Sequence, residues 1–404
     1  MTERFAPTDA AQVLDVMTWA AAAETAVEVI GAGTKRALGR PVQATHQLDL
    51  SGLAGIELYE PAELVMTVLP GTKLATIESE LDAHGQQLAF EPPDLGPLFG
   101  GSAACGTIGG VIACNLAGPR RPKAGAARDH FLGVEAVTGR GEAMKAGGRV
   151  VKNVTGYDLC KLFAGSYGTL AVMTSMTIKV MPAQEKTRTL LVAGLDDVGA
   201  RRAMTAALTS PHEVSAAAHL PAAVAARSAV SYVAGAGAGV TALRVEGPAP
   251  SAEHRCNALR DLLSDYGDIE ELHGHNSVAL WREVGNVAPF VGQPSRVVWR
   301  VSVPPTAGSA VAASILANAH GEAFYDWGGG LIWLSLVDHN AATVRAAVAE
   351  VGGHATLMVA DGAQRDAIAV FEPQEPGLAA LAARVKDGFD PRRILNPGRM
   401  YAGV

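Results

Sequence analysis

The chain has 404 residues, of which 49% are hydrophobic and 18% are charged, so its composition is that of a globular protein with two or three domains. Its formal net charge of −7 opposes nonspecific attraction to nucleic acid, and we expect no nucleic-acid partner. The start, MTERFAPTDAAQVLDVM, lacks a basic region followed by an apolar run, and no uncharged run approaches the ~20 residues that span a bilayer. We therefore expect a cytoplasmic protein that reaches the inner membrane only peripherally, through a partner.

Residues 1–182 predict a mixture of helices and short strands. Apolar residues recur at helical spacing over 8–23, where Thr8 or Asp9 is placed to cap the helix. The next segment, AVEVIGAGTKRALG, alternates apolar and polar residues and then enters a glycine turn, which indicates a strand. Later segments predict a strand over 64–69, a helix over 74–83, and strands in FLGVEAVTG and TLAVMTSMTIKVMP.

After residue 182 the composition shifts toward alanine and valine. Helical patterns near 198–208 and 251–266 alternate with the strand-like runs TRTLLVAG, RVVWRVSVPP and GLIWLSLVD. This order predicts a second α+β domain over 183–360, in which helices cover one face of an antiparallel sheet. The remaining residues, 361–404, predict a short packed tail.

The four cysteines, at 105, 114, 160 and 256, form no CxxC pair. Their spacing matches neither a zinc finger nor an iron–sulfur cluster, and a disulfide framework would have to join distant positions. We interpret them as small buried thiols in a reducing compartment.

The segment GAGTKR at residues 31–36 follows the predicted strand over Val27 and Val29. Glycine leaves backbone N–H groups free to converge on phosphate oxygens, while Thr34 offers a hydroxyl and Lys35 and Arg36 offer charge. The segment lacks the third glycine of a Rossmann fingerprint and the Gly-Lys-Ser/Thr of a Walker loop. It is therefore either a pyrophosphate site or an ordinary turn.

A second glycine-rich segment reads CGTIGGVIACNLAGPRR, from residue 105 to 121. Thr107 is placed to cap a short helix over 109–114, whose first amide groups favour an anion. EPPD precedes this segment and AARDH follows it, so that Arg128 and Asp129 offer a polar anchor. Two such sites indicate one long ligand; the alternative is that the small residues serve only packing.

Several segments carry a family resemblance: GAGTKR, PPD, GTIGGVIACNLAGPRRPKAGAARDH, VVKNVTGYDLCKLFAGSYGTLAVMTSMTIKV and FDPRRILNPGRM. In this order they resemble the FAD-binding domain and tail of the vanillyl-alcohol oxidase superfamily, also called the PCMH type. Within it they are most similar to the FAD-binding E subunits of bacterial glycolate oxidases. The match is dense over residues 1–182 and over the last sixteen residues, whereas the middle is supported by length and position.

The resemblance implies an α+β fold with a two-part PCMH-type FAD-binding domain at 1–182, an α+β cap domain at 183–360, and a segment at 361–404 that returns to the FAD domain. The alternative is a doubly wound nucleotide-binding protein, in which a parallel sheet is followed by a long helix opened by residues 31–33.

The resemblance also implies which residues contact FAD. The pyrophosphate is expected at Gly31, Ala32, Gly33, Thr34, Lys35 and Arg36. The flavin and its phosphates are expected along Pro93, Asp94, Thr107, Ile108, Gly109 and Gly110, with Asn115, Gly118, Arg128 and Asp129 completing the site. Gly168 is expected in the turn beneath the cofactor and Ile178 near the adenine. The first loop has no histidine and Cys105 fits no known attachment pattern, so we expect noncovalent FAD.

Related 2-hydroxy-acid dehydrogenases carry a histidine-rich metal and base motif in the cap domain. The comparable stretch here, FYDWGGGLIWLSL, keeps the glycines and lacks both histidines, so we assign no metal and no catalytic base. His273 and His275 are interpreted as exposed loop residues. In SRVVWRVSV, strand alternation places Arg296 and Arg300 on one face, where they could bind a carboxylate, remain solvated or form an intersubunit ion pair.

The function implied by the resemblance is oxidation of glycolate or a short 2-hydroxy acid to the 2-oxo acid, with hydride transfer to flavin. We expect this chain to carry electrons or support the site, beside a related FAD-containing subunit that oxidises substrate and an iron–sulfur subunit. The alternatives are a self-sufficient FAD-dependent dehydrogenase and a nonenzymatic scaffold that retains the fold.

Overall fold

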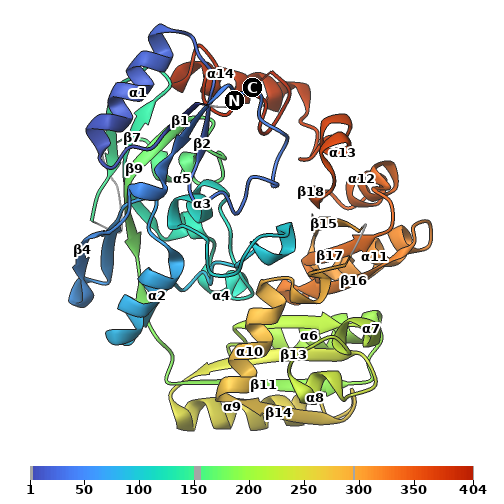
Figure 1. Ribbon diagram of the computed structural model, residues 1–404. Helices are drawn as coiled ribbons and strands as arrows, with labels where there is room; N and C mark the ends of the chain where they lie inside the picture. Colours follow the sequence, from blue (N-terminus) through green and yellow to red (C-terminus); the bar gives the residue numbers. More distant parts are fainter. Residues whose placement is uncertain (1–2, 150–155, 294–295, 404) are drawn as a thin grey trace. The chain divides into compact units, whose positions relative to one another are not determined.

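The computed structural model describes residues 3–149, 156–293 and 296–403, and it divides into two compact units (Figure 1). The first unit comprises Met1–Leu116, Gly125–Ala183 and Pro373–Val404, and the second comprises Ala117–Ala124 and Gln184–Glu372. This division differs from the predicted segments at two places, because residues 117–124 and 361–372 both belong to the second unit.

The first unit contains two main sheets. A three-stranded parallel sheet has the order β1-β3-β2, and a five-stranded antiparallel sheet has the order β4-β5-β9-β7-β8. A small antiparallel pair joins β6 and β10. The strands are β1 (Glu3–Phe5), β2 (Val27–Ile30), β3 (His46–Asp49), β4 (Ile56–Glu60), β5 (Val65–Val68), β6 (Gln86–Gln87), β7 (Phe131–Thr138), β8 (Ala143–Gly147), β9 (Ala171–Lys179) and β10 (Met181–Pro182).

The helices of the first unit are α1 (Ala10–Ala22), α2 (Leu74–Ala83), α3 (Ile108–Ala113), α5 (Leu159–Phe163) and α14 (Pro376–Phe389). The predicted first helix is confirmed, and Asp9 is its cap, since its carboxylate accepts a hydrogen bond from the Gln12 amide at 2.8 Å. The buried face of α1 includes Val13 and Met17, which pack with residues of both sheets. That shared core contains Val13, Met17, Ala20, Ala21, Val27, Leu48, Leu50, Leu53, Val137, Val172, Ile394 and Leu395.

The doubly wound alternative is wrong. Although β2 and β3 are parallel, the chain between Ile30 and His46 forms turns rather than a long helix. Gly33 and Gly39 have φ values of +74° and +88°, a left-handed conformation that interrupts any helix at this point. The remaining sheet of this unit is antiparallel throughout.

The second unit is built on one eight-stranded antiparallel sheet, with the order β14-β11-β13-β12-β16-β17-β15-β18 (Figure 1). The strands are β11 (Lys186–Ala193), β12 (Ala216–Leu220), β13 (Val240–Gly247), β14 (Ile269–His273), β15 (Val297–Ser302), β16 (Gly321–Asp326), β17 (Leu331–Leu336) and β18 (His354–Val359). The α+β fold with an antiparallel cap sheet is therefore confirmed.

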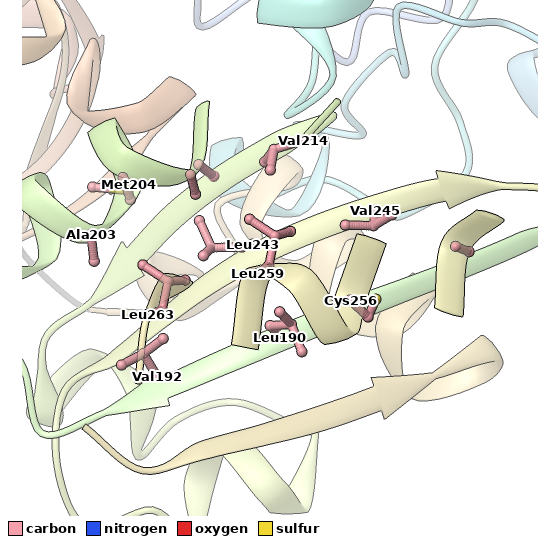
Figure 2. Packing of buried hydrophobic residues seen from close by; sticks show 13 residues of the cluster. Leu190, Val192, Ala203, Met204, Val214, Leu243, Val245, Cys256, Leu259 and Leu263 are labelled. Atoms are coloured by element: carbon pink, nitrogen blue, oxygen red, sulfur yellow. The ribbon is translucent and has the colours of Figure 1, made fainter. Parts of the chain in front are cut away.

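Helices cover both faces of this sheet, so the prediction that they cover one face only is wrong. Figure 2 shows α6 (Asp197–Leu208) and α9 (Ala249–Leu262) packing on the face that carries Leu190 and Leu243. Thr189 points to the opposite face, where it accepts a hydrogen bond from the Trp281 indole of α10 (Gly274–Gly285) at 2.8 Å. The other helices are α4 (Arg121–Ala124), α7 (Ala222–Ala225), α8 (Ser231–Ala234), α11 (Gly308–Leu316), α12 (Ala341–Ala349) and α13 (Gly362–Ala367).

Buried contacts explain the two differences from the predicted boundaries. Arg120 forms an ion pair with Glu246 at 3.2 Å, with both side chains more than nine-tenths buried, and the Trp327 indole donates to the Gly118 carbonyl at 3.1 Å. The Leu357 amide donates to the Val370 carbonyl at 2.8 Å, which extends the edge of the second sheet beyond residue 360. Within the described ranges, no helix is long and apolar enough to cross a membrane.

Candidate functional site

The turn after β2, the helix α3 and the C-terminal tail line one small cavity of about 80 Å³ in the first unit. We call its lining residues the cradle: Val29, Ile30, Gly31, Ala32, Gly33, Thr34, Lys35, Arg36, Thr107, Gly110, Ala113, Cys114, Tyr167, Asn396 and Arg399. The structure thus brings together all of 31–36 with Thr107 and Gly110, as the two glycine-rich segments predicted.

Lys35 places an ammonium group inside the cradle. A Cβ atom built on Gly106 or Gly110 would lie 3.5 or 3.6 Å from its Nζ atom, so the ammonium lies over the start of α3. Nζ donates a hydrogen bond to the Thr34 hydroxyl at 3.3 Å. Burial lowers the pKa of Lys35, and the nearby Cys114 and Asp94 oppose this shift only in part. The cradle therefore holds a desolvated lysine whose charged form needs an anion beside it to be stable.

Arg36 points differently from Lys35. Its guanidinium donates two hydrogen bonds to the Glu28 carboxylate, at 2.9 and 2.7 Å. Gln47 donates to the same carboxylate at 2.8 Å. The charge of Arg36 is thus largely compensated by Glu28, and Lys35 is the stronger source of positive potential in the cradle.

The two adjacent glycines of α3 have different roles. A Cβ atom on Gly109 would lie 2.8 Å from Pro70 Cβ and carbonyl O, so its missing side chain permits close packing with Pro70. A Cβ atom on Gly110 would lie 3.6 Å from the Lys35 side chain and the Thr107 hydroxyl, inside the cradle. Pro70 therefore occupies the space beside Gly109, and contact of either glycine with FAD stays a prediction.

Thr107 precedes α3 with an extended backbone, as a capping residue does, but its side chain makes no capping hydrogen bond. Instead its hydroxyl lies 2.7 Å from the Cβ position of Gly31, so the two glycine-rich segments meet here. Thr107 therefore occupies the predicted N-cap position, but the prediction that its side chain caps the helix is wrong, since it makes no capping hydrogen bond.

The sequence-based prediction included Gly168 in the turn beside Tyr167, but it assigned no residue of the tail to the site. The Asn396 side chain accepts a hydrogen bond from the Val29 amide at 2.7 Å and donates to the Tyr167 carbonyl at 2.8 Å. Arg399 donates to the Lys35 carbonyl at 2.9 Å. The only signal in the sequence was the polar tail motif NPGRM, which assigned no residue to the site.

Several predicted residues lie outside the cradle and hold loops instead. Asp94 accepts hydrogen bonds from the amides of Gly96 and Ala104, at 3.2 and 2.6 Å. Asn115, with a φ of +49°, accepts from the Arg128 amide at 3.0 Å, and Asp129 accepts from the Ala126 amide at 2.9 Å. These bonds fix the segments that flank α3.

The other predicted FAD contacts also lie outside the cradle. Pro93 and Ile108 are buried, and Ile178 lies in the β9 core, opposite Met66 and Phe131.

Gly168 has a φ of +69°, and a Cβ atom there would lie 2.8 Å from the side-chain amide nitrogen of Asn396, which lines the cradle. Gly118 belongs to the second unit, where its carbonyl binds Trp327.

In the second unit, Trp327 lies between charged neighbours. The guanidinium carbons of Arg121 and Arg300 lie 4.5 and 5.0 Å from the centre of its ring. Arg300 is in β15, while Arg296 precedes that strand. His273 ends β14 and His275 lies in α10, so the prediction that both lie in a loop is wrong, although both are exposed and His273 contacts Glu271. The described residues contain no group of three or more His, Cys, Asp or Glu side chains suited to a metal.

Comparison with known proteins also indicates an FAD-binding protein. A family model for an FAD binding domain matches residues 4–147. The chain is 34% identical over 392 residues to the glycolate oxidase subunit GlcE of Escherichia coli, covering 96% of this chain and 97% of that protein. It is 38% identical over 128 residues to the glycolate oxidase subunit GlcD of Bacillus subtilis, covering 32% of this chain and 26% of that protein.

The fold resembles that of a 4-ethylphenol oxidase from Gulosibacter chungangensis, with a TM-score of 0.72 and 16% identity, covering 99% of this chain and 89% of the oxidase. That likeness concerns the fold alone. The match to GlcE, by contrast, extends over nearly the whole of both proteins at 34% identity. On this evidence the protein belongs to the family of the glycolate oxidase subunit GlcE, whose N-terminal region is an FAD binding domain.

Proposed function

We propose that this protein is the FAD-binding subunit of a glycolate oxidase complex and that the cradle holds the diphosphate of FAD. The observation that carries the proposal is the desolvated ammonium of Lys35, enclosed by the glycine turn and α3. Burying a cation is unfavourable unless an anion accompanies it, and a diphosphate supplies that charge. A Cβ atom on Gly110 would lie 3.6 Å from the Lys35 side chain and the Thr107 hydroxyl, so a side chain at this position would enter the cradle beside the ammonium.

Residues 31–36 with Thr107 and Gly110 are the proposed diphosphate contacts. Asp94, Asn115, Arg128 and Asp129 support them by holding the neighbouring loops. Bound FAD supplies a two-electron acceptor and donor. The protein residues bind the cofactor, fix its orientation and exclude water from its phosphates.

We propose that FAD is bound noncovalently. The cradle contains no histidine, and burial raises the pKa of the Cys114 thiol, which keeps it protonated and poorly nucleophilic at neutral pH. Protein purified without added cofactor is expected to be yellow, and acid precipitation is expected to release intact FAD. Colourless protein that takes up no FAD would favour the scaffold alternative.

Within the complex, we assign this chain an electron-carrying or supporting role. The stretch FYDWGGGLIWLSL forms β16, the turn at Trp327–Gly329 and β17, and it supplies no histidine that could act as a base. We propose as partners a related FAD-containing subunit that oxidises glycolate or a short 2-hydroxy acid, together with an iron–sulfur subunit, at the inner membrane surface. GlcD, the second relative, is named as a glycolate oxidase subunit.

An anaerobic titration tests this division of labour. The isolated, FAD-loaded chain is mixed with glycolate or D-lactate while the absorbance of oxidised flavin is followed. We expect no bleaching until the partner subunits are added. Rapid bleaching of the isolated chain by either acid would instead identify a self-sufficient dehydrogenase.

As a second proposal, after that of the cofactor site, Arg300 and Arg296 bind the carboxylate of the substrate. The guanidinium of Arg300 lies over the Trp327 ring, and this supports the assignment for Arg300 because the contact holds the guanidinium plane in a fixed orientation. Arg300→Lys and Arg296→Lys should each raise the KM for glycolate in the assembled complex. Equal KM values for both variants and the unsubstituted complex would remove the assignment.

A further inference from the structure

The C-terminal tail pairs with the strand that leads into the cradle. The Val27 amide donates to the Ile394 carbonyl at 2.8 Å, and the Asn396 amide donates back to the Val27 carbonyl at 3.0 Å. With the Asn396 side chain bound to the Val29 amide, the tail follows β2 up to the turn at residues 31–36. These partners are 367 residues apart in the chain.

Arg399 contacts the end of this turn and the residues that follow it. Its guanidinium donates to the Lys35 carbonyl at 2.9 Å, and its own carbonyl accepts from the Arg40 amide at 2.9 Å. The side chain is only 11% exposed and also lies 3.9 Å from the Glu28 carboxylate. Arg399 is therefore held rigidly by protein groups before any ligand arrives.

The bond to Lys35 has an electrostatic consequence. The Lys35 carbonyl accepts two hydrogen bonds, from the Leu38 amide at 3.0 Å and from Arg399. A carbonyl oxygen that turned toward a diphosphate would repel it, and one that is bonded twice is held in place. Arg399 thus stabilises the conformation in which residue 35 presents its ammonium to the cradle.

We propose that Arg399 is a positioning residue for the cofactor, and that the C-terminal tail clasps the phosphate turn in its FAD-binding conformation. This inference rests on the proposed function, since it assumes that the cradle binds the diphosphate of FAD. It adds that residues near position 400 determine the affinity of a turn near position 35.

The same tail offers a matched control. The Arg393 side chain is bound to Asp387 and to the Gly403 carbonyl, and it does not line the cradle. Arg393→Met and Arg399→Met remove the same charge from the same tail. Arg399→Lys keeps a donor for the Lys35 carbonyl and should restore part of the affinity.

The test is an equilibrium titration of apoprotein with FAD, with ADP as the diphosphate fragment and riboflavin as the fragment without phosphate. Arg399→Met should weaken FAD and ADP binding by roughly tenfold or more, the loss expected for a hydrogen bond to a charged group. Arg393→Met should stay within about twofold. Riboflavin binding should not change with either variant. An Arg399→Met protein that binds FAD as tightly as Arg393→Met would overturn the inference.

A double-mutant cycle separates positioning from a merely independent effect. Each single variant, Lys35→Met and Arg399→Met, weakens FAD binding by a measured factor. If Arg399 acts through the turn that carries Lys35, the double variant should bind FAD more tightly than the product of these two factors predicts. A double variant whose loss of FAD affinity equals the product of the two single losses would overturn the positioning role. Should Arg399→Met fail to fold, the cycle is run with Arg399→Lys, for which the same two outcomes apply. Failure of the unsubstituted protein to bind FAD would refute the proposed function itself, which is a separate result.

Discussion

Gly109 and Gly110 are neighbours in α3, yet their surroundings differ. Gly109→Val forces a side chain against Pro70, so we expect a loss of about 1–3 kcal/mol in the free energy of unfolding, as in other overpacked cores. Gly110→Val adds its side chain to the cradle, so FAD affinity should fall while the apoprotein stays folded. Thermal unfolding of the apoproteins and FAD titration measure the two effects. The assignment fails if Gly110→Val binds FAD normally.

Lys35 predicts a pH dependence. Because burial lowers its pKa, the folded apoprotein binds this proton more weakly than the unfolded chain does, and the free energy of unfolding should rise with pH between the lowered and the ordinary pKa. A diphosphate prefers the protonated ammonium, so FAD affinity should fall over the same pH range. Titrations between pH 7 and pH 10 measure this decline. A decline of equal size in Lys35→Met would contradict the role of Lys35.

At the scale of elements, α14 is anchored by its buried residue Lys386. The ammonium donates to Asp390 at 2.8 Å and to the carbonyls of Thr169 and Leu395, at 2.7 and 2.9 Å. Lys386→Met leaves the Asp390 carboxylate buried without its cation, and we expect the free energy of unfolding to fall by roughly 3–5 kcal/mol. The control is Lys145→Met, which breaks an exposed pair with Glu135 and should cost under about 1 kcal/mol.

Chemical denaturation followed by far-UV circular dichroism measures both variants. Since Leu395 immediately precedes Asn396 of the cradle, Lys386→Met should also weaken FAD binding. Equal stability of the two variants would show that the buried pair does not anchor α14.

At the scale of the whole molecule, residues 117–124 are part of the second unit although first-unit residues flank them in the chain. The Glu246 carboxylate holds Arg120 in this position. Glu246→Gln removes the charge, so the segment should open more often and trypsin should cleave after Arg120 and Lys123 at a higher rate. Gel electrophoresis and mass spectrometry of a limited digest detect these cuts. Unchanged cleavage would show that other contacts suffice to hold the segment.

Local patterns in the sequence determined much of the architecture. The helix α2 has the predicted bounds, Leu74–Ala83, and Asp9 caps α1, because helical periodicity and capping depend on residues a few positions apart. The glycine turn after β2 was recognisable for the same reason. The two glycine-rich segments do line one cavity, and its use by a ligand stays a prediction. The segment 150–155 of the family resemblance lies outside the described residues.

Only the tertiary structure decided which of these residues face the cavity. Gly109 and Gly110 are alike in sequence, but Pro70 covers one and the cradle adjoins the other. Arg36 turns to Glu28 while Lys35 turns inward, and the tail supplies Asn396 and Arg399 across 367 residues. Such contacts depend on the path of the whole chain and on the desolvation of each charge, neither of which is encoded in the spacing of neighbouring residues.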